Sequence, residues 1–318
     1  MPVEEVTKTL RHMWDTDAGN EANSTDVRAS QMNVILHFGL ETTPEEARER
    51  FETAIRFAQR YPSRIVVLCP SSQPSGEQEF EGKLFSQCYI GKHLRDICCC
   101  EALLLGYSPE QSDFLESQVS VWLESDLPIY HWLHRVPPER ISGHYLGFLK
   151  RCRGILFDRS IDDYGDLEWP YPDRVKDLAF ARTLPLRQHI GQFLSGFAPQ
   201  ELVEGLVSLE FQYSVGIQFP AWHLLKWHRN ALEKSFADPD DAQYIRYEFR
   251  PFPNEESHDC LRISWKFKDP AQFLILHYNR SRKSGVLLGK LPSGSFENPL
   301  HIEPLSSEAA LSEAMFFA

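Results

Sequence analysis

The stretch SRIVVLC, residues 63–69, contains five apolar residues in succession. A short, uninterrupted apolar run of this kind is typical of a strand that is buried on both faces, as in a parallel sheet. Residues 33–38 form a second run of the same type. We therefore predict that the N-terminal half contains an open, mainly parallel sheet with helices covering its faces.

The segment between these two strands has the pattern of an amphipathic helix over residues 43–60. Thr43 is followed three residues later by Glu46, which forms a capping box, and the chain ends the helix at Tyr61-Pro62. Strands are expected at 83–90, 97–105, 127–133 and 153–157, and helices at 108–123 and 143–150. This alternation predicts an α/β domain of the doubly wound type.

The second half begins with DLAFARTLPLRQHIGQFL, residues 177–194, whose apolar residues recur at steps of three and four. Pro185 removes a backbone donor, so we expect two short helices or one kinked helix, with Thr183 capping the second part. From residue 243 the period changes to two, which predicts a half-buried antiparallel meander over segments 245–249, 261–267, 272–278 and 286–291.

These patterns predict three parts: an N-terminal amphipathic helix and loop at 1–27, an α/β domain at 28–160 and an α+β domain at 161–318. The boundary is placed in residues 158–172, which combine acidic residues with two prolines and a glycine. The same loop, with Asp158, Asp162, Asp163, Asp166 and Glu168, could hold a cation or an acid/base pair, or be a solvated linker.

Composition narrows the class of protein. The chain has 318 residues, 42% hydrophobic and 25% charged, and a formal net charge of -12. Such a charge argues against binding nucleic acid or an anionic membrane, since both need clustered Lys and Arg. No apolar run is long enough to span a membrane, and MPVEEVTKTL is unlike a signal peptide, so we expect a cytoplasmic protein.

The seven cysteines include no C-x-x-C pair and suit reduced core thiols better than a disulfide framework. Cys98, Cys99 and Cys100 are consecutive, and on a strand at most two of them share a face. His131 and His134 on a strand, and His223 and His228 on a helix, do not converge either. No metal or cofactor site is expected.

Catalytic signatures are also lacking. Gly285-Val-Leu-Leu-Gly289-Lys290 has the wrong spacing for a phosphate loop, and no glycine-rich turn follows the first strand. The turn NRSRKSG contains Arg280, Arg282 and Lys283, and is either a solvated hairpin or a patch for an acidic partner or phosphate. The Trp residues at 132, 222, 227 and 265 are either core or interface anchors.

Four segments, taken together, resemble the glucose-6-phosphate dehydrogenase assembly protein (OpcA) family. The likeness lies in their residues, order and spacing, although the family favours Trp where Phe180 and Leu186 stand and an aromatic residue where Leu133 stands. The segments are Arg28-Ala29-Ser30 with Asn33 and Val34; Pro62-Ser63-Arg64-Ile65-Val66-Val67; Leu127-Pro128-Ile129-Tyr130-His131-Trp132; and Asp177-Leu178-Ala179-Phe180 with Arg182, Pro185 and Arg187.

The resemblance implies a non-enzymatic, cytoplasmic protein of the oxidative pentose phosphate pathway. It would bind glucose-6-phosphate dehydrogenase and promote or stabilise its active oligomer, as an allosteric activator without cofactor. The family gives no active-site residues to carry over. Burial explains Arg182 and Arg187 least, so they are candidate partner contacts if exposed beside an apolar patch and architectural if tied into buried ion pairs. Arg280, Arg282 and Lys283 complete the candidate contact set. The alternative is a sugar-phosphate-binding module or enzyme with a cleft between the domains.

Overall fold

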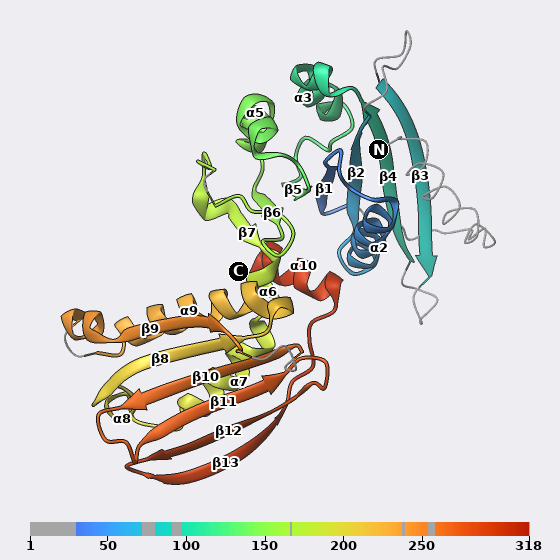
Figure 1. The fold of residues 1–318 in the computed structure, drawn as a ribbon. Coiled ribbons are helices and arrows are strands. Elements are labelled where there is room, and N and C mark those ends of the chain that lie inside the picture. The colour runs from blue at the N-terminus through green and yellow to red at the C-terminus, as the bar shows by residue number, and fades with distance from the viewer. Residues whose placement is uncertain are drawn as a thin grey trace. The chain divides into compact units, whose positions relative to one another are not determined.

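The computed structural model describes residues 30–71, 80–90, 97–165, 167–236, 239–253 and 258–317 (Figure 1). The N-terminal amphipathic helix and loop expected at 1–27 lie outside these residues, and the side chains of Cys98 to Cys100 are not described either. The chain divides into two compact units. Unit 1 is Met1–Leu178 with Ser307–Ala318, and unit 2 is Ala179–Ser306. Within the described residues, no helix is both long and apolar enough to cross a membrane.

Unit 1 contains a seven-stranded sheet in the order β3-β4-β2-β1-β5-β6-β7, here called sheet A. Its neighbours pair in parallel except β3 and β4, which are antiparallel. The predicted mainly parallel sheet is thus confirmed. The strands are β1 (Met32–Phe38), β2 (Ser63–Pro70), β3 (Phe80–Ile90), β4 (Ile97–Tyr107), β5 (Ile129–His134), β6 (Gly154–Phe157) and β7 (Val175–Asp177).

Helices cover both faces of sheet A, as the uninterrupted apolar strands predict. All seven residues of β1 are buried. On one face Leu115, Ile141 and Phe148 pack against the sheet, and on the other Phe57 and Phe316 stack with centroids 6.1 Å apart. The helices are α2 (Pro44–Arg60), η1 (Pro109–Gln111), α3 (Ser112–Ser120), α4 (Pro138–Arg140), η2 (Ile141–Tyr145, a π-helix), α5 (Leu146–Leu149), η3 (Pro172–Arg174) and α10 (Ser307–Phe316).

The division of the chain falls at residue 178, whereas the sequence placed a boundary at 160. Residues 161–178 stay with unit 1 because Tyr164 is buried against Phe157, with ring centroids 5.3 Å apart, and because β7 adds a further parallel strand to β6. The C-terminal helix α10 also returns to unit 1, where it packs against α2.

Unit 2 contains a six-stranded sheet, sheet B, in the order β13-β12-β11-β10-β8-β9. The strands are β8 (Leu206–Tyr213), β9 (Arg246–Pro251), β10 (Cys260–Phe267), β11 (Phe273–Asn279), β12 (Ser284–Leu291) and β13 (Gly294–His301). The helices of the unit are α6 (Leu178–Ala181, which begins at the boundary), α7 (Leu184–Leu194), α8 (Pro199–Val203), η4 (Val215–Ile217), α9 (Gln218–Glu233) and η5 (Pro239–Tyr244).

The antiparallel meander is confirmed for β10, β11 and β12, and β13 extends it. One part of the expectation was wrong. Segment 245–249 does not join the meander, because β9 pairs in parallel with β8 at the opposite edge of the sheet. Its alternation of two is compatible with either pairing, since the period records which face is buried and not the direction of the neighbouring strand.

The core of unit 2 lies on one face of sheet B. Leu261, Ile263 and Trp265 of β10 point to this face and pack with Leu224 of α9 and Ile190 of α7. Figure 1 shows these helices on the same face of the sheet. The alternate residues of β10 point to the other face, and Arg262 and Lys266 among them are exposed.

Candidate functional site

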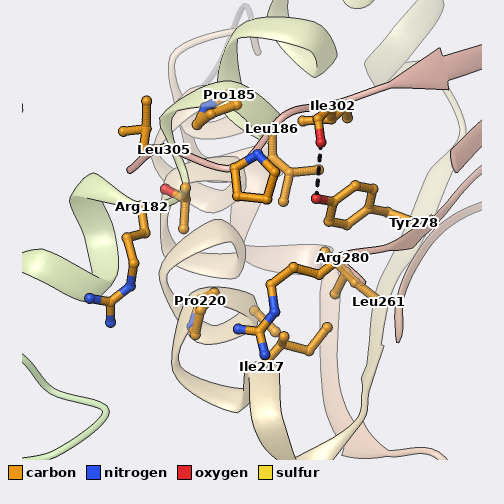
Figure 2. A pocket seen from close by; sticks show the side chains of 13 residues that line it. Arg182, Pro185, Leu186, Ile217, Pro220, Leu261, Tyr278, Arg280, Ile302 and Leu305 are labelled. Carbon is orange, nitrogen blue, oxygen red and sulfur yellow. Dashed lines mark hydrogen bonds between the residues drawn. The ribbon is translucent and has the colours of Figure 1, made fainter. Parts of the chain in front are cut away.

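A small apolar cavity in unit 2 brings together parts of the chain far apart in sequence, and Arg182 and Arg280 both line it (Figure 2). In the close view these two side chains lie on either side of Pro220. The cavity has a volume of about 70 Å³. It is lined by Arg182, Thr183, Pro185, Leu186, Ile217, Pro220, Ala221, Leu261, Tyr278, Arg280, Ile302, Pro304 and Leu305.

The volume of this cavity limits what could occupy it. Pockets that hold drug-sized ligands and cofactors measure roughly 300 to 1,000 Å³. A cavity of about 70 Å³ is far below that range and is lined mostly by apolar side chains. It is better suited to one apolar side chain of a partner protein than to a sugar phosphate.

The break between α6 and α7 positions Arg182 at the cavity. Two short helices form here, as predicted, with Pro185 in the first turn of α7. The prediction that Thr183 caps α7 was wrong, because its side chain makes no capping hydrogen bond. Thr183 occupies the N-cap position, but its hydroxyl donates to the Phe180 carbonyl at 2.7 Å instead of accepting a helix N–H. The residue has helical φ and ψ, which turns its side chain back toward α6.

Arg187 contacts residues at the break between α6 and α7 and is not among the residues that line the cavity. Its Nε donates to Thr183 Oγ1 at 3.0 Å, and its guanidinium lies 4.1 Å from the centroid of the Phe180 ring. Arg182 and Arg187 are both partly buried. Arg187 therefore stabilises the α6–α7 turn, and Arg182 lies beside the apolar lining residues.

The other three predicted residues lie in the turn between β11 and β12. Arg280 pairs with Asp259 at 2.5 Å, and Lys283 pairs with Glu303 at 2.5 Å. The exposed Arg282 donates its backbone N–H to Asn279 Oδ1 at 2.8 Å. The turn is thus held by two ion pairs to residues outside it and by the hydrogen bond to Asn279. Of the three predicted residues, only Arg280 lines the cavity.

Sheet A offers a second place where a ligand would be expected. Apart from β3, its order β4-β2-β1-β5-β6-β7 corresponds to the doubly wound order 3-2-1-4-5-6. In such sheets, ligands bind beyond the carboxyl ends of the strands, where the strand order reverses. Here the order reverses between β1 and β5, so the corresponding crevice, the switch-point crevice, lies beyond Phe38 and His134.

The chain itself fills the switch-point crevice. Gly39 N donates to the His134 carbonyl at 2.8 Å, and a Cβ at Gly39 would lie 1.6 Å from the Arg135 carbonyl oxygen. Arg135 adopts a left-handed φ of 56°, and its Nε donates to both Glu46 carboxylate oxygens at 3.0 and 2.9 Å. This contact, principally, lowers the pKa of Glu46 to about 2.

The N-terminus of α2 is therefore occupied. In dinucleotide-binding folds the helix after the first strand directs its free N–H groups at a pyrophosphate. Here the predicted capping box is confirmed, with Thr43 and Glu46 bonded reciprocally at 3.1 and 3.2 Å, and Arg135 lies on the same carboxylate. An anion at this place would have to displace Glu46.

A buried polar network, not identified from the sequence, crosses sheet A. His37 Nδ1 lies 3.1 Å from His131 Nε2, and His37 Nε2 lies 2.8 Å from the Tyr107 hydroxyl, which lies 2.8 Å from that of Tyr145. Burial lowers the pKa of His131 to about 3 and that of His37 as well, so both rings are neutral at pH 7. The signal in the sequence was the placement of His37, Tyr107 and His131 in apolar runs.

Three further sequence candidates, His131, His134 and Asp162, have structural roles. His131 and His134 point to opposite faces of sheet A, as predicted, since one packs against Phe148 and the other against Phe38. Asp162 of the acidic loop is buried and accepts the Arg135 backbone N–H at 3.0 Å. Burial raises its pKa to about 6. No metal-binding group of three or more His, Cys, Asp or Glu occurs among the described residues.

The chain matches a known protein family over part of its length. Residues 54–168 match the family model OpcA_G6PD_assem, described as the glucose-6-phosphate dehydrogenase subunit N-terminal domain. The match confirms, over these residues, the family resemblance found in the sequence. No curated protein sequence matches the chain.

The solved structures that are similar to the chain include two that cover 90% of it. One is glucose-6-phosphate 1-dehydrogenase from Mycobacterium avium, with 9% identity and a TM-score of 0.48, covering 90% of this chain and 87% of that chain. The other is aldose-aldose oxidoreductase from Caulobacter crescentus complexed with glycerol, with 10% identity and a TM-score of 0.39, covering 90% and 89%. Both TM-scores lie below 0.5, so these likenesses establish neither the fold nor a function.

Proposed function

We propose that the chain is a non-catalytic assembly factor that binds glucose-6-phosphate dehydrogenase and promotes its active oligomer. The observation that carries the proposal is the family match over residues 54–168. The filled switch-point crevice supports the non-catalytic part, because Glu46 and Arg135 occupy the place where a sheet of this order would bind a dinucleotide.

The proposed mechanism is linkage between binding and assembly. A protein that binds the active oligomer more tightly than the inactive form shifts the equilibrium by the ratio of its two affinities. A tenfold ratio corresponds to about 1.4 kcal/mol, so a few kcal/mol of differential affinity would suffice. The chain would then act as an allosteric activator in the cytoplasm, within the oxidative pentose phosphate pathway.

The proposed contact residues are Arg182, Arg187, Arg280, Arg282 and Lys283. Arg182 and Arg280 border the apolar cavity, which could receive one apolar side chain of the dehydrogenase. Arg282 is exposed at the β11–β12 turn and is available for an acidic partner residue. Arg187 would contribute indirectly, by holding the α6–α7 turn in place through Thr183.

The test is whether the purified chain comigrates with the dehydrogenase in size-exclusion chromatography and changes its activity or substrate affinity. Comigration with a kinetic effect is expected at micromolar concentrations. If neither is seen, the proposal is wrong.

The contact residues are tested with Arg282→Glu, for which we expect at least fivefold weaker binding. Lys234→Glu, an exposed change of equal charge at the end of α9, is the matched control. If the two variants bind the dehydrogenase equally well, the β11–β12 turn is not part of the contact surface.

A further inference from the structure

The face of sheet B that points away from the core of unit 2, here called the open face, has an unusual composition. Strand register assigns its residues, because directly paired residues lie on the same face of a sheet. Ser264 pairs with Ile275, which pairs with Leu288, and that residue pairs with Glu297. Flanking rows contain Arg262, His277, Val286 and Pro299 on one side and Lys266, Phe273, Lys290 and Ser295 on the other.

One half of the open face, over β11, β12 and β13, is apolar at its centre. Ile275, Val286 and Leu288 are only partly buried, and Phe273 is 37% exposed. An antiparallel sheet whose outer face meets water normally presents polar residues there. A contiguous apolar patch with a polar rim is instead typical of a surface that binds another protein.

The other half, over β8, β9 and β10, is basic. Glu210 is buried beneath two cations, as Arg250 and Lys266 both bind its carboxylate. Arg246 pairs with Glu248, and Arg262 lies at the junction of the two halves. Across the whole open face, five Lys or Arg residues stand against three Glu residues, while the chain as a whole has a net charge of -12.

The size of the open face fits a protein partner. Six strands spaced about 4.8 Å apart and about seven residues long span a projected area on the order of 600 Å². A standard protein interface buries about 800 Å² on each partner. The β11–β12 turn joins two strands of the sheet at one end, and its Arg280 lines the cavity with the core-face residues Leu261 and Tyr278.

We infer that the open face is a docking surface for the dehydrogenase, and that the dehydrogenase presents to it an apolar patch bordered by acidic side chains. This inference rests on the proposed function. Charge complementarity favours that occupant over a second copy of this chain, since a self-complementary contact would bring the cations of two basic halves into one interface. Arg262 and the Ile275–Leu288 pair form its centre, where partner contacts contribute most to affinity.

The test compares Arg262→Glu and Ile275→Arg with the control Lys234→Glu, which makes the same charge change as Arg262→Glu but at the end of α9. Affinity for the dehydrogenase is measured by isothermal titration calorimetry at low and moderate salt. Each open-face variant is expected to weaken binding at least tenfold, and the control by less than twofold. The wild-type affinity should fall with added salt, whereas Arg262→Glu should lose most of that dependence.

Correct folding of each variant is verified by circular dichroism and by its melting temperature. If wild type binds and both open-face variants bind equally well, the open face is not the interface, although the proposed function stands. If wild type does not bind the dehydrogenase at all, the proposed function fails and this inference with it. The last experiment is sedimentation of the chain alone. If the wild-type chain forms a dimer and Ile275→Arg dissociates it, the occupant of the open face is a second copy of this chain and the inference is wrong.

Discussion

Sheet A is buried on both of its faces, whereas sheet B is buried on one face only. In sheet A, neighbouring residues of β1 point to opposite faces and are both fully buried, as Ile35 and Leu36 show. In sheet B, Leu276 is fully buried whereas its neighbour Ile275 remains partly exposed on the open face. Both faces of sheet A are covered within its own unit, and residues of the chain occupy the switch-point crevice. Sheet B keeps a partly exposed apolar surface that a partner could cover.

Gly39→Ala tests most directly whether the switch-point crevice of sheet A is closed. The added Cβ would meet the Arg135 carbonyl oxygen at 1.6 Å, and a backbone atom cannot move aside as a flexible side chain can. We expect more than about 4 kcal/mol of destabilisation or no folded protein. The control is Gly191→Ala in α7, where nothing lies within 4 Å of the added Cβ and helix propensity favours Ala by up to about 1 kcal/mol. Urea denaturation measures both, and a folded Gly39→Ala of normal stability would show that the crevice can open.

Four truncations compare the two sheets directly. Ile35→Ala and Leu36→Ala in sheet A should each cost about 3 kcal/mol, because both side chains are fully buried. In sheet B, Leu276→Ala should cost the same, but Ile275→Ala only about 1 kcal/mol. Equal losses from Leu276→Ala and Ile275→Ala in the free protein would mean that the open face is covered within the chain itself.

Asp162→Asn tests how the stability of unit 1 depends on pH. Burial raises the pKa of Asp162 to about 6 in the folded state, above its ordinary value of 3.8. The folded state therefore binds the proton more tightly, so this residue adds stability as the pH falls from above 6 to below 4. Relative to the asparagine variant, wild type should gain about 2 to 3 kcal/mol over this range. Parallel stability curves from pH 7.5 to 4 would contradict the assignment.

A smaller effect is expected of Glu46→Gln at the switch-point crevice. The variant loses the charge-assisted bonds from Arg135, at a cost of about 1 to 2 kcal/mol near neutral pH. Because the folded-state pKa of Glu46 is lowered to about 2, the contribution should be complete above pH 4.5 and disappear as the pH falls toward 2. Glu52→Gln on the same helix, with more distant ion pairs of 3.5 Å, should cost less than about 0.5 kcal/mol. A loss in Glu46→Gln that did not depend on pH would point to packing instead of charge.

The sequence by itself determined the local elements. The apolar run at 63–69, the capping box at Thr43 and the break at Pro185 each predicted an element that the structure contains. Alternation along 261–267 predicted which residues of β10 face the core and left Arg262 and Lys266 outward. These features depend on residues within a few positions of one another, so steric preference and periodicity are enough to specify them.

Only the tertiary structure decided how the elements pair. The parallel pairing of β8 with β9, the return of α10 to unit 1 and the approach of Gly39 to Arg135 join residues about 40 to 250 positions apart. The candidate cavity has the same origin, since Arg182 and Arg280 both line it only after α7 and β11 have packed. Period-two alternation is the same for a parallel and an antiparallel neighbour, and it does not record which distant segment supplies the other wall of a cavity. That choice depends on which long-range contacts bury the most surface together, and the open face of sheet B is the surface that those contacts left uncovered within its unit.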